Sequence, residues 1–386
     1  MTTALQQLYN EQGQSPWVDN ITRGSIRSGA LRKLLDEGIR GLTANPTIFQ
    51  KAVSGSADYD DSVREFASQG ASSSEIYEQL IVEDIRDAAD VLRPLYDETN
   101  GGDGYASIEV SPRLAHDTRA TIEEARRFWQ AIDRPNVFIK VPATDLGIPA
   151  IRQLLSEGIN VNITLIFSVE YHERVMDAYI EALEDRAQRG EPIDRLASVA
   201  SFFVSRVDTE VDIRLGKLIE AEQDENRRKD LESLLGKAAI ANAKIAYQRF
   251  LEKFRSERFK ALREHGARVQ RPLWASTGTK NPAYSDVLYV EELIGPDTVN
   301  TLPPATIEAF QDHGRVERTI DRGVEGAYRT IERLETHGVD LREVTDKLQA
   351  DGIEIFIESF RLLDEAIRGK REELLEKRQV VGPAPV

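Results

Sequence analysis

The segment "VFIKVPA" at residues 137–143 has the apolar character of a buried β-strand, yet it contains a lysine, Lys140. Alternate residues of a strand face opposite sides, so Lys140 and Phe138 share one face while Ile139 lies on the other. Charged side chains are rarely buried without a partner or a chemical role. Lys140 therefore needs either an oppositely charged neighbour or a function.

Seven other segments have similar strand character, and amphipathic helical segments separate them. Strands that alternate with helices pair in parallel, and eight of them predict a closed (β/α)8 or TIM barrel. An open doubly wound sheet is the competing arrangement, but no predicted strand leads into a G-x-G-x-x-G turn. The predicted strands are residues 15–21, 41–47, 105–111, 137–143, 161–168, 196–205, 271–278 and 297–303.

The 386 residues are expected to form a single barrel domain with its core at about 15–310. An extra N-terminal helix is predicted at about residues 3–12, and a helical insertion at 208–237 after the sixth strand. Residues 311–386 read as a C-terminal helical extension. Its segment "GIEIFIESFRLLDEAI" has the spacing of a helix packed on the barrel.

Composition narrows the possible functions. The formal net charge of -16 argues against a nucleic-acid or membrane-surface binder, because both need basic faces. No apolar run approaches membrane-spanning length and the start lacks a signal-peptide pattern, so a cytoplasmic location is expected. The chain has no cysteine, and its five histidines lie outside the predicted strands with no pair at ligand spacing, so no metal site is expected.

Polar side chains fall on one parity of the strands, near their carboxyl ends. In a barrel one parity faces the lumen, and active sites lie at the carboxyl end of the strands. The opposite parity is apolar and suits packing against helices. The residues on the lumen parity are Asp19, Thr43, Asn45, Ser107, Glu109, Lys140, Asn162, Thr164, Ser201 and Phe203.

Each of these residues also has a structural interpretation. Lys140 could form an ion pair with Glu109, and Asp19 or Asn45 could serve in turns. Asn162 and Thr164 could satisfy backbone groups, and Ser201 and Phe203 could be core residues. Because six strands repeat the pattern, a polar catalytic pocket is the favoured interpretation.

An amine surrounded by carboxylates and hydroxyls suits Schiff-base chemistry. A lysine amine attacks a carbonyl, and the protonated imine then serves as an electron sink for breaking or making a C–C bond. Burial favours the neutral amine that this step needs, whereas a nearby Glu109 favours the ammonium form. Neighbouring acids and bases must also transfer protons to expel the carbonyl oxygen as water.

The sequence resembles the transaldolase family, in particular its longer bacterial subgroup. The segments "GLTANPTIF" and "VFIKVPATDLGIPAI" look like the two signature segments, and further similar blocks extend over roughly residues 15 to 310. The resemblance implies a barrel enzyme of the pentose phosphate pathway without metal or cofactor. Such enzymes transfer a dihydroxyacetone unit from sedoheptulose 7-phosphate to glyceraldehyde 3-phosphate, giving erythrose 4-phosphate and fructose 6-phosphate.

The resemblance also implies roles for individual residues. Lys140 would form the Schiff base, and Asp19 would be the base that takes the C4 hydroxyl proton. Glu109 and Thr164 would orient a water for imine formation and hydrolysis. The other implied residues hold the hydroxyls of the three-carbon unit, line an apolar wall or bind phosphate, and they are Thr43, Asn45, Asn162, Ser201, Phe203, Arg206 and Lys280.

Two alternatives stay open from the sequence. The first is an aldolase that cleaves fructose 6-phosphate to free dihydroxyacetone and glyceraldehyde 3-phosphate, and the second is a non-catalytic barrel that binds sugar phosphates. Lys280 stands where many family members carry arginine, so a bidentate grip on phosphate would become a point-charge contact. A monomer or a homodimer is expected.

Overall fold

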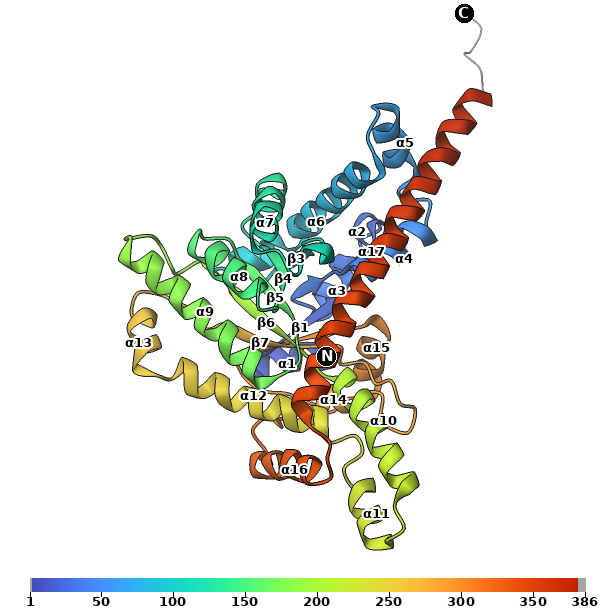
Figure 1. Cartoon of the computed structure of the whole chain (residues 1–386). Helices are drawn as coiled ribbons and strands as arrows, with labels where there is room; N and C mark the ends of the chain where they lie inside the picture. The colour runs from blue at the N-terminus through green and yellow to red at the C-terminus, as the bar shows by residue number, and fades with distance from the viewer. Residues whose placement is uncertain (1, 381–386) are drawn as a thin grey trace, which may run out of the picture.

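The computed structural model of the protein describes residues 2–380, and its centre is a closed barrel of parallel strands (Figure 1). The strands pair in chain order, and β8 pairs with β1 to close the barrel. The predicted (β/α)8 barrel is therefore confirmed, and the open sheet is wrong. The strands are β1 (Gln14–Asp19), β2 (Gly41–Thr43), β3 (Tyr105–Glu109), β4 (Val137–Pro142), β5 (Val161–Ile166), β6 (Ser198–Phe203), β7 (Arg271–Ala275) and β8 (Thr298–Leu302).

The strands end earlier than the sequence predicted, and after β2 and β5 the reason is a capping residue that begins the next helix. Asn45 was expected inside the second strand, but its side chain accepts a hydrogen bond from the Ile48 amide and caps the following helix. Ser168 caps the helix after β5 in the same way.

Helices surround the barrel on all sides (Figure 1). The first of them confirms the N-terminal helix predicted at about residues 3–12. The helices are α1 (Ala4–Gln12), α2 (Arg23–Arg27), α3 (Ala30–Glu37), α4 (Pro46–Gly55), α5 (Asp60–Ser68), α6 (Ser73–Glu98), the 3-10 helix η1 (Pro112–Leu114), α7 (Thr118–Ile132), α8 (Gly147–Ser156), α9 (Val169–Gln188), α10 (Ser205–Ala221), α11 (Glu225–Glu232), α12 (Ala238–Phe254), α13 (Glu257–Arg263), α14 (Leu288–Glu291), α15 (Pro304–His313), α16 (Val324–Thr336) and α17 (Leu341–Val380).

Aromatic rings fill the amino-terminal half of the barrel lumen. The ring centroids of Trp17 and Phe138 are 6.0 Å apart, and those of Tyr105 and Phe138 are 4.3 Å apart. Gly41 makes room for this stack, since a Cβ there would lie 2.6 Å from the Trp17 ring. The rings separate the two ends of the lumen. A hollow of about 760 Å³ opens at the amino ends of the strands, beside Tyr105, Phe138 and Arg271, and a smaller one opens at the carboxyl ends.

Two segments lie outside the minimal barrel. The segment 208–237 contains most of α10 and all of α11. The C-terminal extension contains α16 and α17, and its residues 381–386 lie outside the described part of the chain. Figure 1 shows α17, in red, running diagonally across the barrel from α10 towards α4 and α5, and it contacts these three helices and α6.

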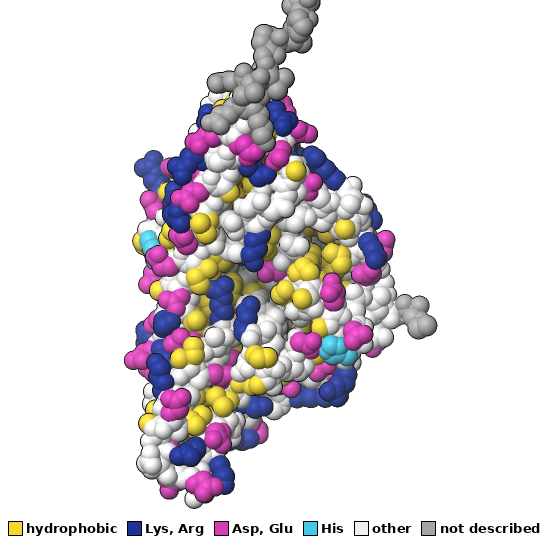
Figure 2. Space-filling view, turned by 90° about the vertical axis from the view of Figure 1, so that its right-hand side faces the viewer, with side chains coloured by type: hydrophobic (Ala, Val, Ile, Leu, Met, Phe, Trp, Pro, Cys, Tyr) yellow, Lys and Arg dark blue, Asp and Glu magenta, His cyan; other side chains and the backbone are white. Residues whose placement is uncertain are grey.

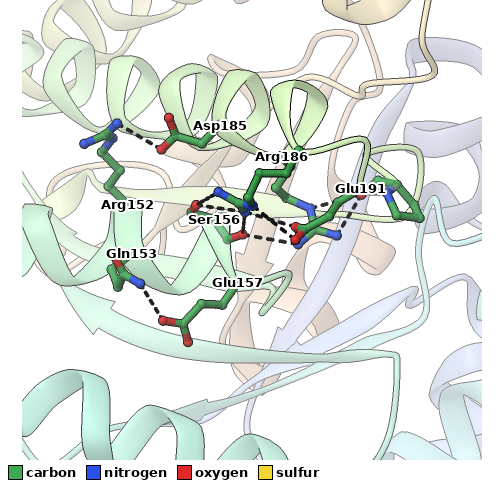
Figure 3. Close-up of polar contacts among 9 residues, drawn as sticks. Arg152, Gln153, Ser156, Glu157, Asp185, Arg186 and Glu191 are labelled. Carbon is green, nitrogen blue, oxygen red and sulfur yellow. Dashed lines mark hydrogen bonds and ion pairs between the residues drawn. The ribbon is translucent and has the colours of Figure 1, made fainter.

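A polar network joins α8 to α9 in the outer layer (Figure 3). Arg152 donates to Asp185 at 2.9 Å, and Arg186 donates to the Ser156 carbonyl oxygen at 3.2 Å. Gly158 follows Glu157, the C-cap of α8, with a φ of 90°, and a Cβ there would lie 2.7 Å from the Arg186 guanidinium. The glycine therefore permits both the turn and the close approach of the arginine.

None of the helices in residues 2–380 has both the length and the apolar character that spanning a bilayer requires.

Candidate active site

Lys140 lies in the barrel lumen beside Glu109. The two residues are register partners on the adjacent strands β4 and β3, so their side chains emerge next to each other on the lumen face. The Lys140 Nζ is 2.9 Å from Glu109 Oε2 and 3.4 Å from the Ala44 carbonyl oxygen. Both side chains are buried, with 4% of each residue exposed. An amine in this position has a carboxylate within proton-transfer distance.

Asp19 forms a second polar group at the end of β1. Thr43 donates a hydrogen bond of 2.7 Å to Asp19 Oδ1, and the hydroxyls of Thr43 and Thr301 are also 2.7 Å apart. Burial raises the pKa of the Asp19 carboxyl above its usual range, although the charge of Lys140 and the Thr43 hydrogen bond act in the opposite direction. A carboxylate with a raised pKa is a stronger base than an exposed aspartate.

Glu109 has a raised pKa for a similar reason. Burial is the largest cause, and the neighbouring Lys140 charge offsets part of it. Glu109 Oε1 and Thr164 Oγ1 are both buried, and neither finds a hydrogen-bond partner within residues 2–380. Buried polar atoms normally have a partner, so these two oxygens are able to bind a water or a substrate group.

Asn162 is held between two serines in the lumen. Ser201 donates to Asn162 Oδ1 at 2.7 Å, and Asn162 Nδ2 donates to Ser107 Oγ at 3.1 Å. All three residues are buried. These bonds set the orientation of the Asn162 amide and leave the second hydrogen of its NH2 group available to a ligand.

A cavity of about 270 Å³ opens at the carboxyl end of the strands. Its walls include most of the residues that the sequence singled out, namely Asp19, Thr43, Asn45, Lys140, Ser201, Phe203, Arg206 and Lys280. The four others, Ser107, Glu109, Asn162 and Thr164, do not line it. Glu109 lies behind Lys140 and accepts a hydrogen bond from it, and Asn162 lies behind Ser201 and accepts a hydrogen bond from it. Thr164 is the register partner of Pro142.

The outer part of the cavity is basic. Arg206 at the start of α10, Lys280 after β7 and Lys51 on α4 all line it. Burial lowers the pKa of Arg206, while the nearby Asp19 charge acts against this effect. In the space-filling view, Lys and Arg side chains surround a hollow near the centre of the face (Figure 2). Local positive charge of this kind can hold an anion on an acidic protein.

Three of the cavity-wall residues that sequence reasoning missed bear on the chemistry of the site, namely Lys51, Thr301 and Phe356. Thr301 could have been found, because it lies near the carboxyl end of β8 on the lumen parity. Lys51 sits on the helix after β2, and Phe356 comes from α17. Neither of these two follows from strand parity, since helices bring them to the site.

His172 is the one histidine of the chain that is buried, and it lies away from the cavity. It packs edge-on against Phe202, with ring centroids 5.6 Å apart, and burial lowers its pKa to about 3. It is therefore a neutral packing residue of α9. Within residues 2–380, no group of three or more His, Asp or Glu side chains could hold a metal ion.

The fold is a (β/α)8 barrel, and its candidate active site combines an amine with two carboxylates. The chain belongs to the family described as "Transaldolase/Fructose-6-phosphate aldolase", which matches residues 16–367. The match continues beyond residue 310 and includes much of α17.

Individual relatives are similar over almost their whole length. A protein named "Transaldolase" from Trichodesmium erythraeum is 49% identical over 365 residues, covering 94% of this chain and 96% of the relative. "Transaldolase 2" from Nostoc sp. is 49% identical over 93% of this chain and 96% of its own. "Transaldolase" from Acidothermus cellulolyticus is 49% identical over 98% of this chain and 100% of its own.

Proposed function

We propose that the protein is a transaldolase that transfers a dihydroxyacetone unit from sedoheptulose 7-phosphate to glyceraldehyde 3-phosphate, giving erythrose 4-phosphate and fructose 6-phosphate. The observation that carries this proposal is the buried Lys140 amine, 2.9 Å from Glu109 and in one cavity with Asp19. Membership of the transaldolase family and the names of the relatives support it.

The first half of the reaction is formation of an imine on Lys140. The raised pKa of Glu109 makes this carboxylate able to take the lysine proton, which leaves a neutral amine. The amine attacks the C2 carbonyl of the ketose, a C–N bond forms, and the carbonyl oxygen leaves as water. Glu109 and Thr164, whose buried oxygens have no protein partner in the described residues, would hold that water.

The second half is cleavage and transfer. Asp19 takes the proton of the C4 hydroxyl, the C3–C4 bond breaks, and its electron pair enters the protonated imine to give an enamine. The aldose phosphate leaves, and the enamine carbon then attacks the aldehyde carbon of the acceptor. Asp19 returns its proton to the new hydroxyl, and hydrolysis of the imine frees the product and the Lys140 amine.

Side chains around the cavity would position the substrate. Thr43, Asn45, Asn162 and Ser201 present hydroxyl and amide groups to the three-carbon unit, and Phe203 forms an apolar wall. The phosphate lies with Arg206 and Lys280, and we add Lys51 because it lines the same basic part of the cavity. Three cations there explain how a protein with a net charge of -16 binds an anionic sugar.

Borohydride trapping tests the proposal. Fructose 6-phosphate and borohydride should reduce a stable adduct onto Lys140, located by peptide mapping, and Lys140→Met should abolish it. Asp19→Ala should still form this adduct but lose C–C cleavage, because it lacks the base and keeps the amine. An adduct on another lysine would contradict the role of Lys140, and normal turnover by Asp19→Ala would contradict the role of Asp19.

The family description also names fructose-6-phosphate aldolase, so release of free dihydroxyacetone is the second candidate activity. The two activities differ only in whether the enamine meets an aldehyde or a proton and water. Assays of fructose 6-phosphate with and without erythrose 4-phosphate distinguish them. A transaldolase turns over rapidly only when the acceptor is present.

A further inference from the structure

We infer that α17 forms a wall of the active site that keeps water from the lysine-bound intermediate, and that Phe356 determines the partition between transfer and release. The inference rests on the proposed transaldolase reaction and deepens it. It assigns a specificity-determining residue to a helix that follows all eight strands in the chain.

Phe356 faces the reacting amine. Its ring lines the same cavity as Lys140 and Asp19, and the Lys140 Nζ is 5.8 Å from the ring centroid. The residue is only 3% exposed, so its ring is enclosed between α17 and the mouth of the barrel. An apolar ring at this position takes up space that solvent would otherwise occupy beside the imine carbon.

Specific contacts hold α17 over the ends of β4 and β5. Gln349 Nε2 donates to the carbonyl oxygens of Ala143 at 3.0 Å and Leu165 at 3.3 Å. A Cβ on Gly352 would lie 3.0 Å from the Leu165 side chain, so the glycine allows the helix to approach this closely. On the other side of Phe356, the Ser359 hydroxyl is 2.7 Å from that of Thr47 on α4.

The contact with Leu165 reaches the catalytic machinery directly. Leu165 follows Thr164 and has a φ of 57°, in the left-handed region that a leucine rarely adopts. The pairing of β5 with β6 shifts register at this point, between Ile163 and Ile166. Such strained backbone persists only when surrounding contacts hold it, and Gln349 and Gly352 supply two of them. The helix therefore supports Thr164 as well as covering Lys140.

Water access matters at one step of the reaction. After cleavage, the enamine carbon can form a C–C bond with the acceptor aldehyde. Alternatively, the enamine carbon takes a proton and water then adds to the imine carbon. The C–N bond breaks, dihydroxyacetone leaves, and the Lys140 amine is regenerated. Removing the Phe356 ring opens space beside the intermediate, so the second route should gain relative to the first.

The test compares Phe356→Ala and Phe356→Leu with Phe360→Ala. Phe360 lies one turn further along α17 and packs on Tyr77, with ring centroids 5.1 Å apart, outside the cavity wall. Each protein is given fructose 6-phosphate, with erythrose 4-phosphate to measure transfer and without it to measure dihydroxyacetone release. We expect the ratio of release to transfer to rise about tenfold or more in Phe356→Ala. In Phe360→Ala the ratio should equal that of the unmodified protein.

The outcomes separate the two proposals. If the unmodified protein gives no borohydride adduct on Lys140 and no transfer, the proposed function fails. If the unmodified protein gives both the adduct and transfer, but the ratio of release to transfer is unchanged in Phe356→Ala, only the inference about Phe356 is overturned. Should the alanine variant not fold, an unchanged ratio in Phe356→Leu overturns it in the same way. An equal rise in Phe360→Ala would likewise overturn it, because loosening of α17 would then be the cause.

Discussion

At the scale of single residues, the ion pair between Lys140 and Glu109 is better explained by chemistry than by stability. Desolvation of a buried ion pair often cancels its electrostatic attraction, so well-packed apolar residues would stabilise the barrel at least as well. Placing the two groups on adjacent strands instead holds a proton donor and acceptor 2.9 Å apart without any loop or helix. This arrangement supports the proposed transfer of a proton between the two groups.

Thr43 provides a test of how Asp19 is tuned. Its hydrogen bond of 2.7 Å stabilises the Asp19 carboxylate and lowers its pKa against the larger effect of burial. Thr43→Val removes this bond, so the pKa of Asp19 should rise further. Because Asp19 must be ionised to act as a base, the acid limb of kcat/KM should move to higher pH by about half to one unit.

Thr43→Ser is the matched control, since it keeps the hydroxyl and should leave the acid limb unchanged. Profiles of kcat/KM for fructose 6-phosphate against pH measure both variants. A shift of the acid limb to lower pH in Thr43→Val would show that the hydrogen bond does not stabilise the carboxylate.

At the scale of elements, short connections after the strands bring the functional groups together. Asn45 caps α4 with its side-chain oxygen while lining the cavity, and α4 then carries Lys51 to the same cavity. Arg206 lies near the start of α10, directly after β6. Two of the three basic residues of the cavity, Lys51 and Arg206, are therefore positioned by the helices that follow β2 and β6, whereas Lys280 lies in the connection after β7.

The turn after α8 offers a stability prediction. Gly158 and Gly190 occupy equivalent positions, each following the last turn of a helix with a φ of 90° and 72° respectively. A Cβ on Gly158 would meet the Arg186 guanidinium at 2.7 Å, whereas one on Gly190 would meet nothing within 4 Å. Gly190→Ala should lower the free energy of unfolding by about 1 kcal/mol, and Gly158→Ala by about 2–3 kcal/mol.

The difference between the two variants isolates the displacement of Arg186 and its network (Figure 3). Urea unfolding followed by circular dichroism measures both free energies. Equal losses would mean that Arg186 moves aside without penalty and that only the backbone conformation matters.

At the scale of the whole molecule, α17 is an integral part of the barrel. Its residues Ile353, Phe356, Leu363, Ile367 and Leu374 are all buried, and it contacts α4, α5, α6 and α10. The sequence set 311–386 apart as an extension, but α17 reaches the cavity that contains Lys140, because Phe356 lines it.

Deletion of residues 341–386 should therefore prevent stable folding. Each of the five buried side chains contributes about 2–5 kcal/mol when fully packed, and the net stability of a domain is only about 5–15 kcal/mol. Soluble yield and thermal unfolding measure the effect. A control chain ending at Val380 keeps every contact that the structure describes and should behave as the full chain does. A soluble, cooperatively unfolding 1–340 chain would contradict this view of α17.

Strand periodicity predicted much of the fold and the pocket. The alternation in β4 placed Lys140 in the lumen, and the same parity placed Asp19 and Thr43 there. The catalytic and binding roles themselves stay predictions. Strand periodicity could not predict Lys51 or Phe356. Both side chains come from helices, and the sequence of a strand does not indicate which helical side chain will lie over its end.

The sequence by itself determined where eight strands would form and, for six of them, which face turns inward with the lysine among its polar groups, because these properties depend on local alternation along the chain. Only the tertiary structure decided that Phe356 lies against the Lys140 amine and that Gln349 and Gly352 hold the strained Leu165. Those contacts depend on how α17 crosses the closed barrel. That crossing follows from packing between segments far apart in the chain, which no local pattern encodes.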